Sequence, residues 1–185
     1  MKYNIRRWNP LLIAIPDIGI GMMWGSLGNV VAFFGYTFTN SAADIAKIYS
    51  LAAIVGVFTQ VVVGVLSDKT KHRWGKRSPW LVFGMVGAAI SIALWPLATN
   101  FMMFLIMTGV TCTLVNVAQC AYYTMVMEVV DADQVGYANT LARTTATVGG
   151  LFMGGLAGFL WNSQHPEFTF FAMASVRSFS RIPSA

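Results

Sequence analysis

Long apolar stretches separated by short polar segments occupy almost the whole chain. Five of them, at about 11–38, 45–66, 80–98, 101–127 and 135–161, reach the length of about 20 residues that a membrane-spanning helix needs. A sixth, at about 168–176, is too short to cross a bilayer. The pattern predicts an all-α integral membrane protein, with a six-helix transmembrane bundle over residues 11–176 whose sixth helix is incomplete.

The composition favours the same class of protein. Of 185 residues, 56% are hydrophobic and only 10% are charged, whereas a soluble domain carries about 25% charged residues. The net charge of +5 does not indicate nucleic-acid binding, because the basic residues flank the apolar stretches. The sequence has no catalytic nucleophile motif, zinc spacing or phosphate-binding loop. We therefore expect neither an enzyme nor a metal site, and no cofactor beyond a coupling ion.

Basic residues are distributed unevenly between the two sides of the predicted bundle. The N-terminal segment 1–10 and the loop 67–79 carry most of them, and the loops on the opposite side contain only Lys47. Cytoplasmic loops are enriched in Lys and Arg, so we expect a multi-pass protein of the plasma membrane with a cytoplasmic N-terminus. Residues 177–185 do not continue the sixth helix, and we expect an atypical tail produced by truncation or a frameshift.

Two charged side chains lie inside predicted helices, Asp17 in the first and Arg143 in the fifth. A charge within a bilayer is expensive and marks a candidate functional site. The spacing places Asp17 and Trp24 on one helical face, and the depth of Arg143 is similar to that of Asp17. The two charges can pair or bind one ligand together. Alternatively, the acid reaches water at the interface and the arginine extends to the headgroups.

Uncharged polar residues mark the second and fourth predicted helices. Asn116, Gln119 and Tyr123 share a face of the fourth helix next to Tyr122, and Gln60 lies in the second helix. Amides and phenols suit hydroxyl-rich ligands because they both donate and accept hydrogen bonds. The same groups also form hydrogen bonds between helices, worth about 0.6 kcal/mol each. The fifth helix has a small residue at every fourth position, which predicts close packing against another helix: Ala142, Ala146, Gly150, Gly154 and Gly158.

The loop between the second and third helices contains a specific motif. Residues 64–80 read G-V-L-S-D-K-T-K-H-R-W-G-K-R-S-P-W. This resembles the major facilitator superfamily loop Gly-x-x-x-Asp-Arg/Lys-x-Gly-Arg/Lys-Arg/Lys. Its longer spacing is similar to that of the glycoside–pentoside–hexuronide:cation symporters. Asp68 can meet a helix N-terminus or a cation in only one transport state. We expect a conformational-switch loop formed by Gly64, Asp68, Lys69, Arg73, Gly75, Lys76 and Arg77.

The resemblance implies the N-terminal half of a secondary active sugar transporter, with the substrate held between two six-helix bundles. The partners are then the sugar, the lipid bilayer and a missing C-terminal bundle. In this family an Asp on helix one and an Arg on helix five contact the sugar, which implies that role for Asp17 and Arg143. The helix patterns add further substrate-binding candidates, namely Trp24, Asn116, Gln119 and Tyr122.

The coupling ion stays open between H⁺ and Na⁺. The family's cation site uses carboxylates on helices two and four, and the corresponding positions here hold the neutral residues Gln60 and Asn116. The cation-coupling candidates are Asp17, Gln60 and Asn116. Two alternatives to sugar symport are a facilitator for another small solute and a non-transporting membrane fragment.

Overall fold

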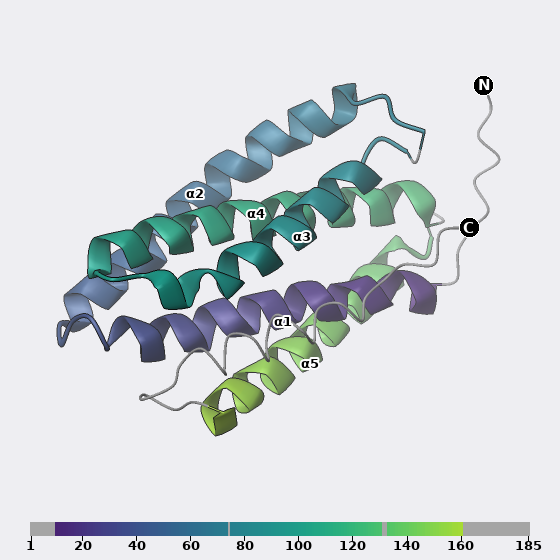
Figure 1. Cartoon of the computed structure of the whole chain (residues 1–185). Coiled ribbons are helices and arrows are strands. Elements are labelled where there is room, and N and C mark those ends of the chain that lie inside the picture. The colour runs from purple at the N-terminus through teal and green to yellow at the C-terminus, as the bar shows by residue number, and fades with distance from the viewer. Residues whose placement is uncertain (1–9, 74, 131–132, 161–185) are drawn as a thin grey trace.

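The structure is a computed structural model that describes residues 10–73, 75–130 and 133–160 (Figure 1). Within these residues it contains five α-helices and one short 3₁₀ helix, and no strand. The helices are α1 (Pro10–Gly35), α2 (Ala42–Lys69), α3 (Ser78–Ala93), α4 (Phe101–Val129) and α5 (Val135–Leu160), and the 3₁₀ helix η1 is Trp95–Leu97. The predicted sixth segment at 168–176 and the tail at 177–185 lie outside the described residues.

Helix ends differ from the predicted ranges where local chemistry stops or extends a helix. The first helix ends at Gly35 rather than about residue 38, since residues 36–38 form a turn. The third ends at Ala93 rather than about residue 98, because Pro96 lacks the backbone donor that the next helical turn requires. The fourth continues to Val129 rather than ending at about residue 127, so Glu128 belongs to α4.

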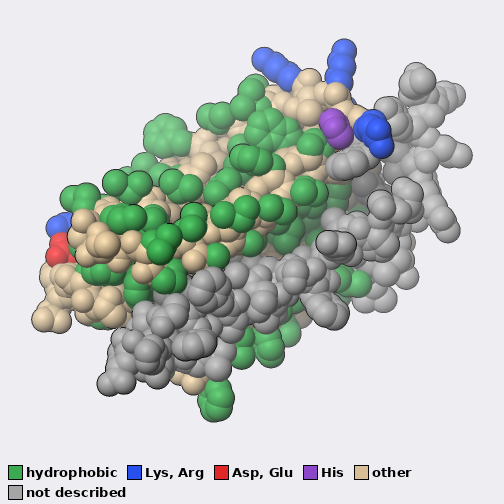
Figure 2. Space-filling model, in the orientation of Figure 1, with side chains coloured by type: hydrophobic (Ala, Val, Ile, Leu, Met, Phe, Trp, Pro, Cys, Tyr) green, Lys and Arg blue, Asp and Glu red, His purple; other side chains and the backbone are tan. Residues whose placement is uncertain are grey.

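The outer surface of the bundle is apolar. Helix α2, for example, exposes Val57, Phe58 and Val61 by 66%, 69% and 66%. Contact of so much apolar surface with water is unfavourable. Among the described residues, four segments are long and apolar enough to cross a membrane, namely 14–35, 42–69, 78–97 and 101–128. Figure 2 shows apolar side chains over the middle of the visible face, most of the visible basic side chains at one end, and basic and acidic side chains at the other. This distribution suits a bilayer with a polar rim.

Helix α4 is the centre of the described bundle. It packs against α2 and α3 on one side and meets α1 on the other, while α1 lies along α5 (Figure 1). One apolar cluster, around Phe34, Trp95 and Phe104, joins α1, η1 and α4 towards one end. A second cluster includes Ile20 and Tyr122 and joins α1, α3, α4 and α5 towards the other end. The functional candidates on α1, α4 and α5 lie beside this second cluster.

The contact between α1 and α5 depends on residues without bulky side chains. A Cβ atom added to Gly21 would overlap the backbone of Ala146, and one added to Gly25 would overlap Gly150. On the other helix, Gly149 meets the backbone carbonyl of Ile18 in the same way. This confirms the close approach predicted from the small residues of the fifth helix, and it identifies α1 as the partner helix.

Substitution of Gly21 by valine should weaken the α1–α5 contact, because the new side chain collides with the backbone of Ala146. Overpacking of this kind costs about 1–3 kcal/mol. The loss is measured as a lower midpoint of unfolding in SDS titrations followed by circular dichroism. Gly158→Val is the matched control, since a Cβ at Gly158 meets no described atom within 4 Å. Equal effects of the two substitutions would contradict the proposed packing.

Candidate functional site

A groove of about 520 Å³ lies between α1, α4 and α5. The close α1–α5 packing contributes the small residues Gly21, Gly25, Ala146 and Gly150 to its lining. Ligand sites of this size accommodate small organic molecules. Its polar lining comes from all three helices and consists of Trp24, Asn29, Gln119, Tyr123, Arg143 and Thr147. The groove therefore collects polar side chains within an otherwise apolar bundle.

Trp24 and Gln119 connect α1 to α4 across the groove. The indole Nε1–H of Trp24 donates a 2.9 Å hydrogen bond to Oε1 of Gln119. Trp24 remains 38% exposed, so part of the residue is accessible to a ligand. Gln119 is half-buried, and its side chain also hydrogen-bonds to Tyr123, so it connects two polar groups of the groove. Two residues predicted from separate helices are thus brought into direct contact.

Arg143 enters the groove from α5. Its guanidinium carbon lies 4.4 Å from the centroid of the Tyr123 ring, a cation–π contact between α5 and α4. The side chain is exposed and forms no ion pair with any residue that the structure describes. Its planar fork of N–H donors is therefore available to a ligand oxygen.

Asp17 lies beneath the groove rather than in its lining. The residue is fully buried, and neither carboxyl oxygen has a hydrogen-bond partner among the described residues. The charge of Arg143 and the hydroxyl of Tyr123 are near enough to act on it electrostatically, but no ion pair joins Asp17 to Arg143. In this conformation, Asp17 does not line the groove and influences it only through Arg143 and Tyr123.

Gln60 and Asn116 lie at the separate contact between α2 and α4. The Nε2 of Gln60 donates a 3.1 Å hydrogen bond to Oδ1 of Asn116, and the Nδ2 of Asn116 donates to the carbonyl of Cys112 at 2.8 Å. The Asn116 amide is thereby engaged in holding two helices together. Neither residue lines the groove, and the structure also buries Tyr122 completely in the second apolar cluster.

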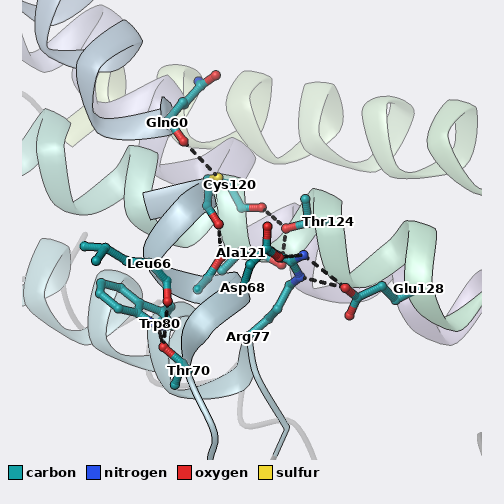
Figure 3. Close-up of polar contacts among 12 residues, drawn as sticks. Gln60, Leu66, Asp68, Thr70, Arg77, Trp80, Cys120, Ala121, Thr124 and Glu128 are labelled. Carbon is teal, nitrogen blue, oxygen red and sulfur yellow. Dashed lines mark hydrogen bonds and ion pairs between the residues drawn. The ribbon is translucent and has the colours of Figure 1, made fainter. Parts of the chain in front are cut away.

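A charged network joins the ends of α2, α3 and α4 (Figure 3). Arg77 precedes α3 and donates from Nη2 to Oδ1 of Asp68 at 2.5 Å and to Oε1 of Glu128 at 3.0 Å. Its Nη1 donates to Oγ of Ser67 at 2.8 Å. The arginine side chain is 8% exposed, whereas those of Asp68 and Glu128 are 62% and 48% exposed. One buried guanidinium therefore links three helices.

The electrostatic setting keeps Arg77 charged. Burial alone lowers the pKa of Arg77, but the hydrogen bond and charge of Glu128, together with Asp68, raise the pKa above its ordinary value. Sequence reasoning placed Asp68 and Arg77 in one switch loop but missed Glu128 as their partner. One sequence feature could have identified Glu128: it is an acid at the end of the fourth apolar segment, which the predicted topology places on the same side of the membrane as the basic loop 67–79.

A family model for MFS/sugar transport proteins matches residues 12–179. The chain belongs to this family. A curated relative, the uncharacterized symporter sll1374 of Synechocystis sp. (strain ATCC 27184 / PCC 6803 / Kazusa), is 30% identical over 67 residues. That match covers 34% of this chain and only 12% of the relative's length.

Membership of the MFS/sugar transport family agrees with the helical, apolar structure and identifies a multi-pass membrane protein. It points to a transporter rather than to an enzyme. It also confirms the resemblance inferred from the loop at residues 64–80. The expected six-helix bundle stays a prediction, because the described residues contain five of the six segments and four helices of clear membrane-spanning character.

The remaining residues of the MFS loop motif have different surroundings. Gly75 has a φ of 100°, a left-handed conformation that favours glycine and allows the chain to turn from α2 into α3. Gly64 faces open space, since a Cβ atom added there would meet no described atom within 4 Å. Lys69, Arg73 and Lys76 are exposed. Among the described residues, no group of three or more His, Cys, Asp or Glu side chains can hold a metal ion.

The network at the end of the bundle predicts a large difference between neighbouring basic residues. Arg77→Gln should lower the stability of the protein by about 1–3 kcal/mol, because charge-assisted hydrogen bonds to two acids are lost. Thermal unfolding followed by tryptophan fluorescence measures this change. Lys76→Gln, at an exposed position, should alter stability by less than about 0.5 kcal/mol. Similar losses in both variants would contradict a specific role for Arg77.

Proposed function

We propose that this chain forms the N-terminal bundle of a secondary transporter that carries a sugar or glycoside together with a proton. The observation that supports this most strongly is the groove between α1, α4 and α5, where an indole, an amide and a guanidinium meet. An aromatic face packs on the apolar side of a sugar ring, and the amide and guanidinium bind its hydroxyl oxygens. Trp24, Gln119 and Arg143 are the proposed sugar-binding residues.

Proton coupling is assigned to Asp17. The Asp17 carboxyl is fully buried and has no hydrogen-bond partner among the described residues, and burial of an unpaired carboxylate charge is expensive, which suits a group that carries the coupled proton. Arg143 on α5 and the hydroxyls of Tyr122 and Tyr123 on α4 are the charged and titratable groups that act on it. Gln60 and Asn116 offer no carboxylate for Na⁺, and they hydrogen-bond to each other. The symporter in the relative's name agrees with a coupled mechanism.

Transport by this mechanism requires a second wall for the groove. In carriers built from two bundles, the substrate lies at the interface and the bundles rock around it. The proposal accordingly includes a C-terminal six-helix bundle as partner and a plasma-membrane location. The Arg77 network joins α2, α3 and α4 at one end of this bundle, which favours movement of these three helices together.

A binding experiment on the chain in lipid nanodiscs can distinguish sugar binding by Arg143 from proton binding by Asp17. Radiolabelled glycosides and a scintillation proximity assay report affinity between pH 5.5 and 7.5. Wild-type affinity should fall as the pH rises, because fewer Asp17 carboxyls then carry a proton. Asp17→Asn should bind without pH dependence. Arg143→Gln should bind at least about 10-fold more weakly at every pH, through loss of a charged hydrogen bond.

Asp44→Asn is the matched control for the acid, because Asp44 lies in the first turn of α2, pairs with Lys47 and does not line the groove. This control should retain wild-type affinity and pH dependence. Absence of glycoside binding by the folded wild-type chain would refute the proposed function. Unchanged binding by Arg143→Gln would remove Arg143 from the sugar site.

The orientation of the bundle is open to direct labelling. In a variant with Cys112 and Cys120 replaced by alanine, single cysteines at His72 and Thr99 lie in loops at opposite ends of α3 and η1. A membrane-impermeant maleimide added to intact cells should label the cysteine at position 99 and spare the one at position 72, because basic loops face the cytoplasm. The opposite labelling pattern would invert the proposed topology.

A further inference from the structure

The acids of the Arg77 network do not neutralise the positive charge at their end of the bundle. Asp68 and Glu128 are both bonded to Arg77. Three lysines near this network are exposed and form no ion pair with any residue that the structure describes, namely Lys69, Lys71 and Lys76. Their ammonium groups are therefore open to a negatively charged partner from outside the described bundle.

Lys69 lies at the end of an apolar stripe on α2. The side chains seven, four and three residues before Lys69 share its helical face and are exposed apolar groups, namely Val62, Val65 and Leu66. From Val62 to Lys69 the helix rises about 10 Å, at about 1.5 Å per residue. The stripe thus ends in a cation and presents apolar surface along the rest of its length.

Helix α3 has the same arrangement at its first turns. It begins at Ser78, two residues after Lys76, and one of its faces carries the exposed side chains Val82, Phe83 and Val86. Figure 2 shows that basic side chains at this end of the visible face adjoin apolar ones. Positive charge and exposed apolar surface are therefore adjacent on both helices.

Two hydrogen bonds hold the start of α3 to the end of α2 (Figure 3). The Nε1–H of Trp80 donates to Oγ1 of Thr70 at 2.9 Å, and the Thr70 hydroxyl donates to the carbonyl of Leu66 at 2.9 Å. Tryptophan is enriched at membrane–water interfaces, where the indole ring is in an apolar layer and its N–H reaches polar groups. These bonds keep the lysines close to the level at which the apolar stripes end.

We propose that Lys69, Lys71 and Lys76, together with the apolar stripes of α2 and α3, form a binding surface for an anionic phospholipid. The lipid phosphate accepts hydrogen bonds from the ammonium groups, and the acyl chains lie along the exposed valines and Phe83. A nucleic acid or an acidic protein would match the charge but not the adjoining apolar surface. The surface is separate from the groove residues, so the inference does not rest on sugar transport.

The test measures lipid binding to the purified chain in micelles of a neutral detergent. Energy transfer from tryptophan to a fluorescent acyl chain reports the affinities for phosphatidylglycerol and for phosphatidylcholine with identical chains. Each basic residue at an anionic surface strengthens association about 5-fold, so the wild type should prefer phosphatidylglycerol by at least about 10-fold. The triple variant Lys69→Gln/Lys71→Gln/Lys76→Gln should lose most of this preference.

Two controls separate the local charge from other effects. Lys47→Gln removes an exposed lysine 22 positions before Lys69, about 33 Å away along α2, and should leave the preference unchanged. The triple variant Lys69→Arg/Lys71→Arg/Lys76→Arg keeps the charge and should keep the preference. Circular dichroism should be the same for all variants, because the substituted side chains are exposed.

A preference that is lost in the glutamine variant, and retained in the arginine variant and in Lys47→Gln, supports the lipid surface. Equal affinity of the wild type for the two lipids overturns it, as does a preference that the glutamine variant retains. Displacement of phosphatidylglycerol by an equal concentration of free glycerol 1-phosphate also overturns it, because the lysines then bind a small anion without need of the apolar stripes. All these results leave the proposed function intact.

Discussion

The close contact between α1 and α5 is the constraint on which the candidate site depends. Gly21 and Gly25 allow the backbones of Ala146 and Gly150 to approach until no further side-chain atom fits between them. Lipid tails are as apolar as leucine, so such packing stabilises membrane helices more than apolar burial does. It also fixes the rotation of both helices. Trp24 and Arg143 consequently face the same groove.

Arg77 and Arg143 show how the same kind of side chain has different roles in different surroundings. Arg77 is buried and shares its donors among Asp68, Glu128 and Ser67, so it holds helices together and has little capacity left for a ligand. Arg143 is exposed and contacts only an aromatic face among the interactions described for its side chain. A satisfied charge rigidifies the structure, whereas an accessible donor set can bind a ligand.

Several residues predicted as site members contribute to the structure in another way. Asn116 and Tyr122 are buried, and Asn116 holds α2 to α4 through Gln60. Periodicity places Asn116 and Gln119 on one face of a helix, but one turn of α4 separates a residue that contacts α2 from one that contacts α1. Which neighbour each residue meets depends on where the other helices pack, and a single-helix pattern carries no information about that.

The sequence alone determined the helical membrane class, the approximate positions of five helices, the family-specific loop and the small-residue seam of the fifth helix. These follow from local properties: the length of the apolar runs, the spacing of small residues, and the proline and charged residues that interrupt the runs. Only the tertiary structure decided that α1 is the partner of that seam, that Glu128 completes the Arg77 network and that Asp17 lies beneath the groove. Those relations join residues far apart in the chain, and they arise from the mutual packing of helices whose individual patterns permit several arrangements.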